Sequence, residues 1–373
     1  MNILLVGGGL QGLSCGESLF KKHTVSVISK SFQSLKSRFF KHCYHLGESD
    51  LSELYNILEE NHTDVLLPIS DFSVPIVSKN KEVLEKRFHI KCAVPDYEKV
   101  YIVEDKSRFM SFCEKNNVPH PQTRRLSFDN LVTVSSEVGF PALIKPDYSV
   151  GARGITRVNS LNELILEFSA VSEKYGSCTL QEFIDNNDYY YNVMLYRNKE
   201  GVIISSAILK IVRMFPIGGG SSSCCVTVEN DELVDLCADC LDKLDWVGMA
   251  DFDVLQRLDN GEYKIIEINA RVPASLRGAA ISGVNFPEII VNDAMGNDVP
   301  VYTYSPGKTM RYMGLDLMWF LKSPNRFHTT PCWFNFFGKD IYYQDIYKED
   351  ISTWWTWLAE GVKKIGKRNK KLR

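Results

Sequence analysis

Acidic and amide side chains of one predicted hairpin could bind a metal ion. Two segments, DFDVLQRL and YKIIEINA, have the composition of strands and are joined by an Asp-Asn-Gly turn at residues 259–261. In an antiparallel pair of this length, Asp253 lies close to Glu267, and Asn269 shares the face of Glu267 because it is two residues further on. Three oxygen donors of this kind suit Mg²⁺, which is often shared with substrate phosphates. An ordinary hairpin with polar residues at its solvated end is the alternative.

A lysine and a small-residue loop upstream could bind phosphate groups. Lys145 stands among apolar residues at the end of the predicted strand at 139–146, where a buried cation is costly unless an anion meets it. The loop Ser149–Ile155 that follows could lay backbone N–H groups against phosphate oxygens. It lacks the Gly-Lys-Ser/Thr ending of the Walker loop, and a plain hairpin turn would explain it equally well.

Two further cations precede a second glycine-rich loop. Lys210 and Arg213 lie in the predicted strand AILKIVRMFP, just before the loop Gly218–Ser223. Cations beside such a loop suit an anionic substrate or an acyl phosphate. The alternative is an exposed strand with solvated charges.

The first hundred residues alternate strand and helix. Ile3–Val6, Val25–Ser29 and Val65–Ile69 read as strands, with a helix at Leu51–Asn61 before the third. Alternating βαβ units predict a parallel sheet with helices on both faces.

The glycines after the first strand match a dinucleotide fingerprint incompletely. Gly7, Gly9 and Gly12 have its spacing, but it also expects an acid about 20 residues on, at the end of the second strand. Ser29 and Lys30 stand there instead. The pattern therefore favours a tight strand-to-helix turn over NAD binding.

Composition limits the classes of protein. The chain has 373 residues, enough for two or three domains, and its net charge of −3 argues against a general nucleic-acid binder. Ten cysteines, with no signal peptide at the start, favour the reducing cytoplasm. Cys237 and Cys240 form a Cys-x-x-Cys within a helical pattern, which predicts buried thiols and not a metal site. No apolar run approaches the roughly 20 residues that cross a bilayer.

Taken in order, these segments resemble the ATP-grasp superfamily, with carbamoyl phosphate synthase and the amino-acid ligases as the nearest branches. The resemblance covers roughly residues 1–300 and implies an α/β protein: a Rossmann-like parallel domain at 1–100, an ATP-grasp domain at 101–300 with a lid subdomain at about 120–190, and an aromatic-rich extension at 301–373.

The resemblance also implies a site that binds ATP with Mg²⁺ or Mn²⁺. Asp71 would lie near the substrate cleft, and Arg271 would contact the transferring phosphate, while Lys210 and Arg213 grip the substrate. The residues implied to bind the nucleotide are Lys106, Lys145, Ser149, Gly151, Gly154, the hinge Gln181, Glu182, Phe183 and Ile184, and Asp188 on the ribose; those implied to hold metal are Asp253, Glu267 and Asn269.

One departure concerns a second phosphate arginine. The synthases have it three residues after the first, where this chain has Ala274, and Arg277 is the candidate replacement.

The implied activity is ATP-dependent ligation of a carboxylate to an amine through an acyl phosphate. The alternatives are a synthase-like enzyme that activates bicarbonate and a nucleotide-binding protein without catalysis. The implied partners are small molecules and a second copy of the chain, without nucleic acid. The basic, aromatic C-terminus, WWTWLAEGVKKIGKRNKKLR, could also form an amphipathic helix on a membrane surface.

Overall fold

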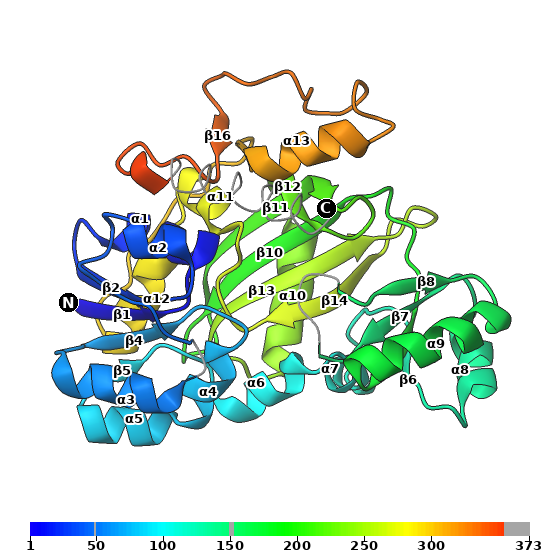
Figure 1. Ribbon diagram of the computed structural model, residues 1–373, viewed down its shortest axis with the longest axis horizontal. Coiled ribbons are helices and arrows are strands. Elements are labelled where there is room, and N and C mark those ends of the chain that lie inside the picture. The colour runs from blue at the N-terminus through cyan, green and yellow to red at the C-terminus, as the bar shows by residue number, and fades with distance from the viewer. Residues whose placement is uncertain (48–49, 149–152, 354–373) are drawn as a thin grey trace, which may run out of the picture.

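The computed structural model describes residues 1–47, 50–148 and 153–353. These residues form three β-sheets with helices packed around them (Figure 1). The five-stranded sheet lies at one side of the molecule, the four-stranded sheet at the other, and the seven-stranded sheet between them.

The N-terminal sheet is parallel, as the alternating pattern predicts. Its strand order is β3-β2-β1-β4-β5, and every pair in it is parallel. Its strands are β1 (Asn2–Val6), β2 (Thr24–Ile28), β3 (His42–Tyr44), β4 (Val65–Pro68) and β5 (Lys91–Cys92). The helices between them are α1 (Gly9–Leu19), α2 (Phe32–Lys36), α3 (Leu51–Glu60), α4 (Ser73–Lys79) and α5 (Lys81–Phe88).

The glycine turn after β1 is filled by serine side chains. A Cβ added at Gly8 would lie 1.8 Å from Oγ of Ser29, so the turn is closed against the end of β2. Ser34 Oγ accepts a hydrogen bond of 3.0 Å from the backbone N–H of Gly9, at the start of α1. The glycines therefore serve close packing, which agrees with the interpretation as a tight turn.

A small antiparallel sheet follows two connecting helices, α6 (Tyr97–Glu104) and α7 (Lys106–Lys115). Asp105 begins α7 as its N-cap, because its carboxylate accepts the backbone N–H of Arg108 at 2.8 Å. The sheet has the order β6-β9-β7-β8. Its elements are β6 (Thr123–Arg125), α8 (Leu131–Val138), β7 (Ala142–Pro146), β8 (Thr156–Val158), α9 (Leu161–Tyr175) and β9 (Cys178–Glu182).

The seven-stranded sheet has the order β14-β13-β10-β11-β12-β15-β16 and is antiparallel except between β15 and β16. It continues past residue 300, because the last two strands come from the C-terminal region. Its strands are β10 (Tyr190–Arg197), β11 (Ile203–Phe215), β12 (Ser221–Val228), β13 (Gly248–Gln256), β14 (Tyr263–Asn269), β15 (Thr309–Arg311) and β16 (Ile341–Tyr343). The helices are α10 (Asp231–Lys243), α11 (Leu276–Ile281), α12 (Phe286–Met295) and α13 (Met313–Lys322).

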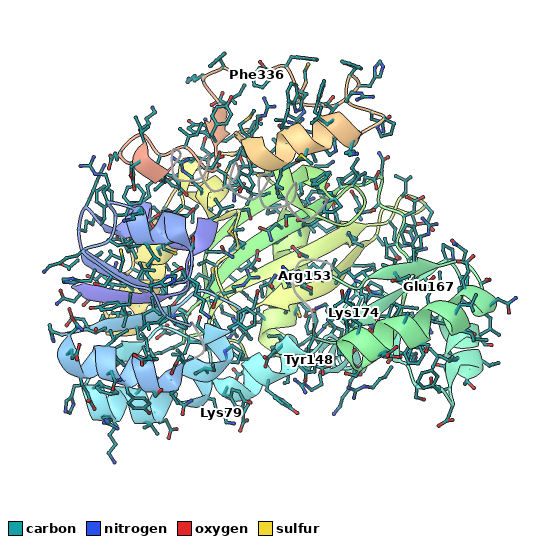
Figure 2. All side chains as sticks on the ribbon, viewed as in Figure 1. Lys79, Tyr148, Arg153, Glu167, Lys174 and Phe336 are labelled. Atoms are coloured by element: carbon teal, nitrogen blue, oxygen red, sulfur yellow. The ribbon has the colours of Figure 1, made fainter. Side chains whose placement is uncertain are left out.

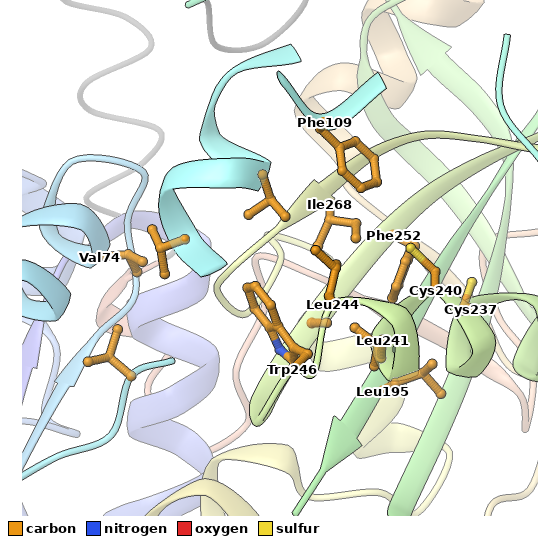
Figure 3. Packing of buried hydrophobic residues seen from close by; sticks show 14 of the residues in the cluster. Val74, Phe109, Leu195, Cys237, Cys240, Leu241, Leu244, Trp246, Phe252 and Ile268 are labelled. Carbon is orange, nitrogen blue, oxygen red and sulfur yellow. The ribbon is translucent and has the colours of Figure 1, made fainter. Parts of the chain in front are cut away.

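Side chains on the two faces of this sheet enter different hydrophobic clusters. On one face, Val193, Phe252 and Ile268 share a cluster with side chains of α10. Cys237 and Cys240 belong to that helix (Figure 3). Both cysteines are free and fully buried, which confirms the prediction of core thiols. The opposite face packs against α11 and α12 through residues such as Met194 and Leu209. Each strand therefore presents alternate side chains to two cores.

The C-terminal region is attached by a buried ionic cluster. Asp316 of α13 is fully buried and accepts hydrogen bonds from Arg213 at 2.7 and 3.0 Å and from Nε of Arg311 at 2.8 Å. Aromatic rings, among them Trp333 and Phe336, pack against one another above it (Figure 2). Within the described ranges, no helix is both long and apolar enough to span a membrane.

Candidate functional site

The predicted hairpin is β13 and β14, and its register brings the proposed metal ligands together. Asp253 is paired with Glu267, and Asp251 with Asn269. Because side chains alternate along a strand, all four residues face the same side of the sheet. A bulge after Asp253 shifts the register toward the turn, but the paired ends at the site are regular.

Asp251 is a site residue that the sequence reasoning missed. Its side chain is buried and accepts hydrogen bonds from the amides of Asn192 at 2.5 Å and Asn269 at 3.2 Å. The signal was available, because Asp251 is two residues before Asp253 and so lies on the same face of a strand.

Asn192 is the second residue that sequence analysis did not identify. It lies in β10 opposite Asp253, and its amide also donates to Asp253 Oδ1 at 3.2 Å. Ser275 donates to Asn192 Oδ1 at 2.7 Å, which fixes the orientation of the amide. No local pattern predicts this residue, because only the pairing of β10 with β13 brings it to the carboxylates.

Two lysines from other elements reach the same carboxylates. Lys106, at the start of α7, places Nζ 3.7 Å from Glu267 Oε2. Lys145 lies in β7 of the small sheet and is buried, and its charge interacts with those of Glu267, Lys106 and Asp253. The site therefore lies where the small sheet, α7 and the large sheet meet.

Burial gives these charged groups unusual protonation equilibria. It lowers the pKa of Lys145 to about 8, and the nearby cation of Lys106 acts in the same direction. Burial, followed by the charge of Glu267, raises the pKa of Asp253 to about 7. The pKa of Asp251 is raised well above its usual range, again chiefly by burial. Three neighbouring acids, one of them buried and two half-buried, favour an additional cation.

The donor set fits magnesium that is shared with a ligand. Carboxylate and amide oxygens are the donors that Mg²⁺ prefers, and it usually keeps part of its coordination shell for water or phosphate. Within the described part of the chain, no group of three or more His, Cys, Asp or Glu side chains forms a metal cage of its own.

Arg271 joins the site to the N-terminal sheet. Its Nε donates to Asp71 Oδ1 at 2.6 Å, and Nη2 donates to Asn269 Oδ1 at 3.2 Å. Asp71 follows β4, so this ion pair links two sheets across 200 residues of sequence. Arg271 therefore contacts both Asn269, a proposed metal ligand, and Asp71 of the N-terminal domain.

The proposed adenine hinge, Gln181–Ile184, begins in the last two residues of β9 and ends two residues after that strand. The Gln181 amide donates to Thr123 Oγ1 at 3.0 Å, and the Glu182 carboxylate accepts the N–H of Gln122 at 3.1 Å and pairs with Arg257. Both side chains are thus bonded within the protein, and the backbone N–H groups of Glu182 and Phe183 donate to Gln122 O at 2.8 Å and Pro141 O at 3.2 Å. Ile184 is buried, and the Phe183 ring lies 4.0 Å from the Arg157 guanidinium.

The proposed ribose residue and lid loop are placed only in part. Asp188 is exposed, has a positive φ of 57° and lies in the connection between β9 and β10. Ser149 and Gly151 lie outside the described residues. Gly154 is described with a φ of +79° and packs so closely against Tyr175 that a Cβ would lie 2.7 Å from its ring. In the view of Figure 2, Arg153 lies between the small and large sheets.

Arg213 and Lys210, which were predicted to contact the substrate, do not lie at the site. Arg213 is buried and bonded to Asp316, with Nη1 donating to Pro331 O at 2.8 Å, so the prediction of a substrate contact is wrong. Lys210 is paired with Tyr191, on the sheet face opposite Asn192 and Asp253, and its Nζ lies 3.9 Å from the Tyr189 ring centroid. This placement contradicts its predicted contact with the substrate as well.

Arg277 does not replace the missing phosphate arginine. Its Nε and Nη2 each donate to Glu17 at 2.9 Å, and Nη1 donates to the carbonyls of Tyr343 and, at 2.7 Å, Ile346. With every nitrogen bonded, the guanidinium connects α1, α11 and the C-terminal region. Its role is structural.

Comparison with known proteins agrees with this geometry. Residues 103–275 match the model of the ATP-grasp domain family. The chain is 26% identical over 210 residues to the carbamoyl phosphate synthase large chain of Methanothermobacter thermautotrophicus, covering 52% of this chain and 19% of that one. It is 22% identical over 298 residues to D-aspartate ligase of Enterococcus faecium, covering 73% of this chain and 70% of the ligase.

A solved structure gives the same fold. Biotin carboxylase from Campylobacter jejuni, solved as a β-γ-ATP complex, superposes with a TM-score of 0.69 over 81% of this chain and 73% of that chain, at 15% identity. Residues 103–275 are thus similar to the ATP-grasp domain, and the fold agrees with that similarity. The chain spans only about a fifth of the synthase large chain that it matches, and most of the ligase.

Proposed function

We propose that the protein is an ATP-dependent ligase that activates a carboxylate as an acyl phosphate and joins it to an amine. The observation that carries this proposal is the convergence of Asp251, Asp253 and Glu267 with Lys106 and Lys145. Acids of this kind suit Mg²⁺, and lysines contributed by two other elements suit the oxygens of a triphosphate. D-aspartate ligase, which is similar over most of this chain, supports C–N bond formation as the reaction.

The residues have separate roles in this proposal. The metal would be held by Asp253, Glu267 and Asn269, together with Asp251. When the metal is bound, its positive charge offsets the negative charge of the phosphates. Lys106 and Lys145 would hold phosphate oxygens, and Arg271 would stabilise the charge of the transferring phosphoryl group. The loop that contains Ser149, Gly151 and Gly154 would exclude water, which otherwise hydrolyses an acyl phosphate. Gln181–Ile184 and Asp188 remain our proposal for the adenosine.

The two chemical steps follow from the substrates. A carboxylate oxygen attacks the γ-phosphorus of ATP, the bond from that phosphorus to the β–γ bridging oxygen breaks, and ADP leaves. A neutral amine then attacks the carbonyl carbon, inorganic phosphate leaves with the C–O bonding electrons, and the amine loses a proton. Positioning and charge neutralisation carry most of the first step, because the protein forms no covalent bond in it.

Phosphate release tests the proposal. Purified protein with Mg·ATP is screened against pairs of carboxylic acids and amines, including amino acids, and against bicarbonate alone. We expect release that requires both an acid and an amine. Release with bicarbonate alone would instead support an activity like that of the synthases, and absence of release with every pair would overturn the ligase proposal.

Glu267→Gln tests the metal site within that assay. The substitution keeps the shape and removes the charge, so we expect release to fall by at least ~100-fold, in line with the loss of a charge-stabilising contact of a few kcal/mol. Glu262→Gln, at an exposed position of the same hairpin, is the matched control. An unchanged rate in Glu267→Gln would refute the metal assignment.

We also propose the division into residues 1–100, 101–300 and 301–373 as functional units, and a cytoplasmic location. All ten cysteines are free thiols, which supports a reducing compartment. The proposed membrane-binding helix falls on residues 354–373, which lie outside the described ranges.

A further inference from the structure

A cavity of about 300 Å³ lies beside the metal site, between the N-terminal sheet and the seven-stranded sheet. Its walls come from the ends of β4 and β5, the start of β13, the residues after β14, and α12. The volume is at the lower end of the roughly 300–1,000 Å³ found for small-molecule sites, so it suits a compact molecule.

The lining of the cavity combines apolar and polar side chains. Pro68, Ala93, Met249 and Ile290 line it, together with neighbouring aliphatic side chains. Pro68 and Ala93 lie at or just beyond the carboxyl ends of parallel strands, where open α/β sheets commonly bind ligands. The cavity therefore offers both apolar and charged surface to a ligand.

One wall of the cavity reaches the catalytic region. It includes residues 270–272, among them Arg271. Arg271 donates to Asn269 of the metal site and to Asp71, so an acid bound at Arg271 would lie next to the proposed metal ligands.

Other parts of the wall carry an excess of positive charge. Lys91 and Lys199 line the cavity, and within the described ranges of the chain neither forms an ion pair. The two acids of the wall are already hydrogen-bonded, Glu85 to the backbone N–H of Cys92 at 2.9 Å and Asp293 to the Tyr196 hydroxyl at 2.7 Å. The two lysines thus favour an anionic group in the cavity.

We propose that this cavity binds the carboxylic acid substrate, and that this substrate is a compact acid with a second anionic group. The group to be activated lies at Arg271, the carbon chain lies against the apolar walls, and the second anion lies at Lys91 and Lys199. This inference rests on the proposed ligase function and adds to it the class of acid that is activated.

Filling the cavity tests the location. Ala294→Trp adds a large side chain to the cavity wall from α12, and Asn297→Trp adds the same bulk at an exposed position just past that helix. Phosphate release is measured against succinate, glutarate, aspartate and glutamate, each with a panel of amines, and Mg·ATP binding is measured by calorimetry. We expect the KM for the diacid to rise at least 10-fold in Ala294→Trp only, with Mg·ATP affinity unchanged in both variants.

Removing the lysine charges tests the class of acid. Lys91→Gln and Lys199→Gln should raise the KM for the diacid at least 5-fold each and leave the KM for ATP unchanged. If the wild-type protein prefers butyrate or alanine to every diacid, the proposed second anionic group of the substrate is wrong. If Ala294→Trp has wild-type kinetics, the proposed location of the substrate is wrong. Protein that binds Mg·ATP but responds to no diacid also overturns this inference, whereas protein that fails to bind Mg·ATP overturns the proposed function itself.

Discussion

At the scale of single residues, the site depends on charges that are unfavourable in isolation. Asp251 is buried and Asp253 is half-buried on one face of β13, and Glu267 is paired with Asp253 across the hairpin. Without a cation, desolvation and repulsion raise the pKa of both aspartates. Such a cluster is retained at a stability cost when it has a function, and cation binding is the function that its chemistry favours.

Asp251→Asn tests the residue that sequence analysis missed. Because the amide keeps the shape but removes a carboxylate from the metal region, we expect the Mg²⁺ concentration for half-maximal phosphate release to rise about 10-fold, or about 1.4 kcal/mol. A magnesium titration at saturating ATP measures this shift. Asp259→Asn in the exposed hairpin turn serves as the control, and an unchanged titration in Asp251→Asn would restrict Asp251 to a structural role.

A second buried acid, Asp345, gives a pH dependence that is independent of the catalytic site. Burial raises its pKa from 3.8 to about 6, and among the described residues neither carboxylate oxygen has a hydrogen-bond partner with ordinary geometry. The folded state therefore holds this proton more tightly than the unfolded chain. The contribution of Asp345 to stability falls as pH rises from about 4 to about 6, and the loss persists above pH 6.

Asp345→Asn should therefore stabilise the protein at neutral pH and not in acid. We expect a gain on the order of 1–3 kcal/mol at pH 7.5, because the variant has no charge to desolvate, and little change near pH 4. Thermal unfolding at the two pH values measures the difference. A variant with equal or lower stability at pH 7.5 would show that the Asp345 charge is compensated in the folded protein.

At the scale of elements, α13 is held to the large sheet by ions that are out of contact with water. Asp316 accepts from Arg213 of β11 and Arg311 of β15, and all three side chains are buried. A sequence pattern of basic residues before a glycine-rich loop suggested a substrate site, but α13 covers Arg213. The partner, Asp316, lies about a hundred residues later, so no local feature could reveal the pair.

Asp316→Ala would leave two buried arginines without their shared anion. Breaking a buried pair in this way costs about 3–5 kcal/mol, so we expect a large decrease in the thermal unfolding temperature. Asp340→Ala removes an exposed partner of Lys308, whose charge is screened by water, so it should lower the unfolding temperature much less. Similar unfolding temperatures for the two variants would contradict the structural importance of the cluster.

At the scale of the whole molecule, the candidate site is assembled from three sheets and a connecting helix. The small sheet supplies Lys145, α7 supplies Lys106, the large sheet supplies the acids, and the loop after β4 supplies Asp71. The ion pair of Asp71 with Arg271 is a direct polar link between the N-terminal sheet and the catalytic region. Relative movement of these parts would therefore alter the orientation of Arg271.

Asp71→Asn tests this connection. A neutral amide holds Arg271 less firmly, so we expect phosphate release to fall about 10- to 100-fold, a loss of about 1.4–2.7 kcal/mol in transition-state stabilisation. The affinity for Mg·ATP, measured by calorimetry, should change less than about 3-fold. Glu59→Gln removes an exposed acid of the same domain, and equal rates in both variants would contradict a positioning role for Asp71.

The sequence by itself determined the local features of this protein. Strand and helix periodicity predicted the parallel N-terminal sheet, and the Asp-Asn-Gly turn predicted the hairpin whose register pairs Asp253 with Glu267. The tight turn around Gly8 and the helical pattern around Cys237 were likewise interpreted correctly, because glycine spacing and apolar periodicity are local signals.

Only the tertiary structure decided which charged side chains share a site. Asn192 reaches Asp253 through strand pairing across 61 residues, whereas Lys210 faces the other side of the same sheet. Arg213 and Arg277 have suitable chemistry but are bonded to Asp316 and Glu17, which lie far away in the sequence. Residue type and spacing specify what a side chain could bind, but long-range packing determines whether it remains free to bind it.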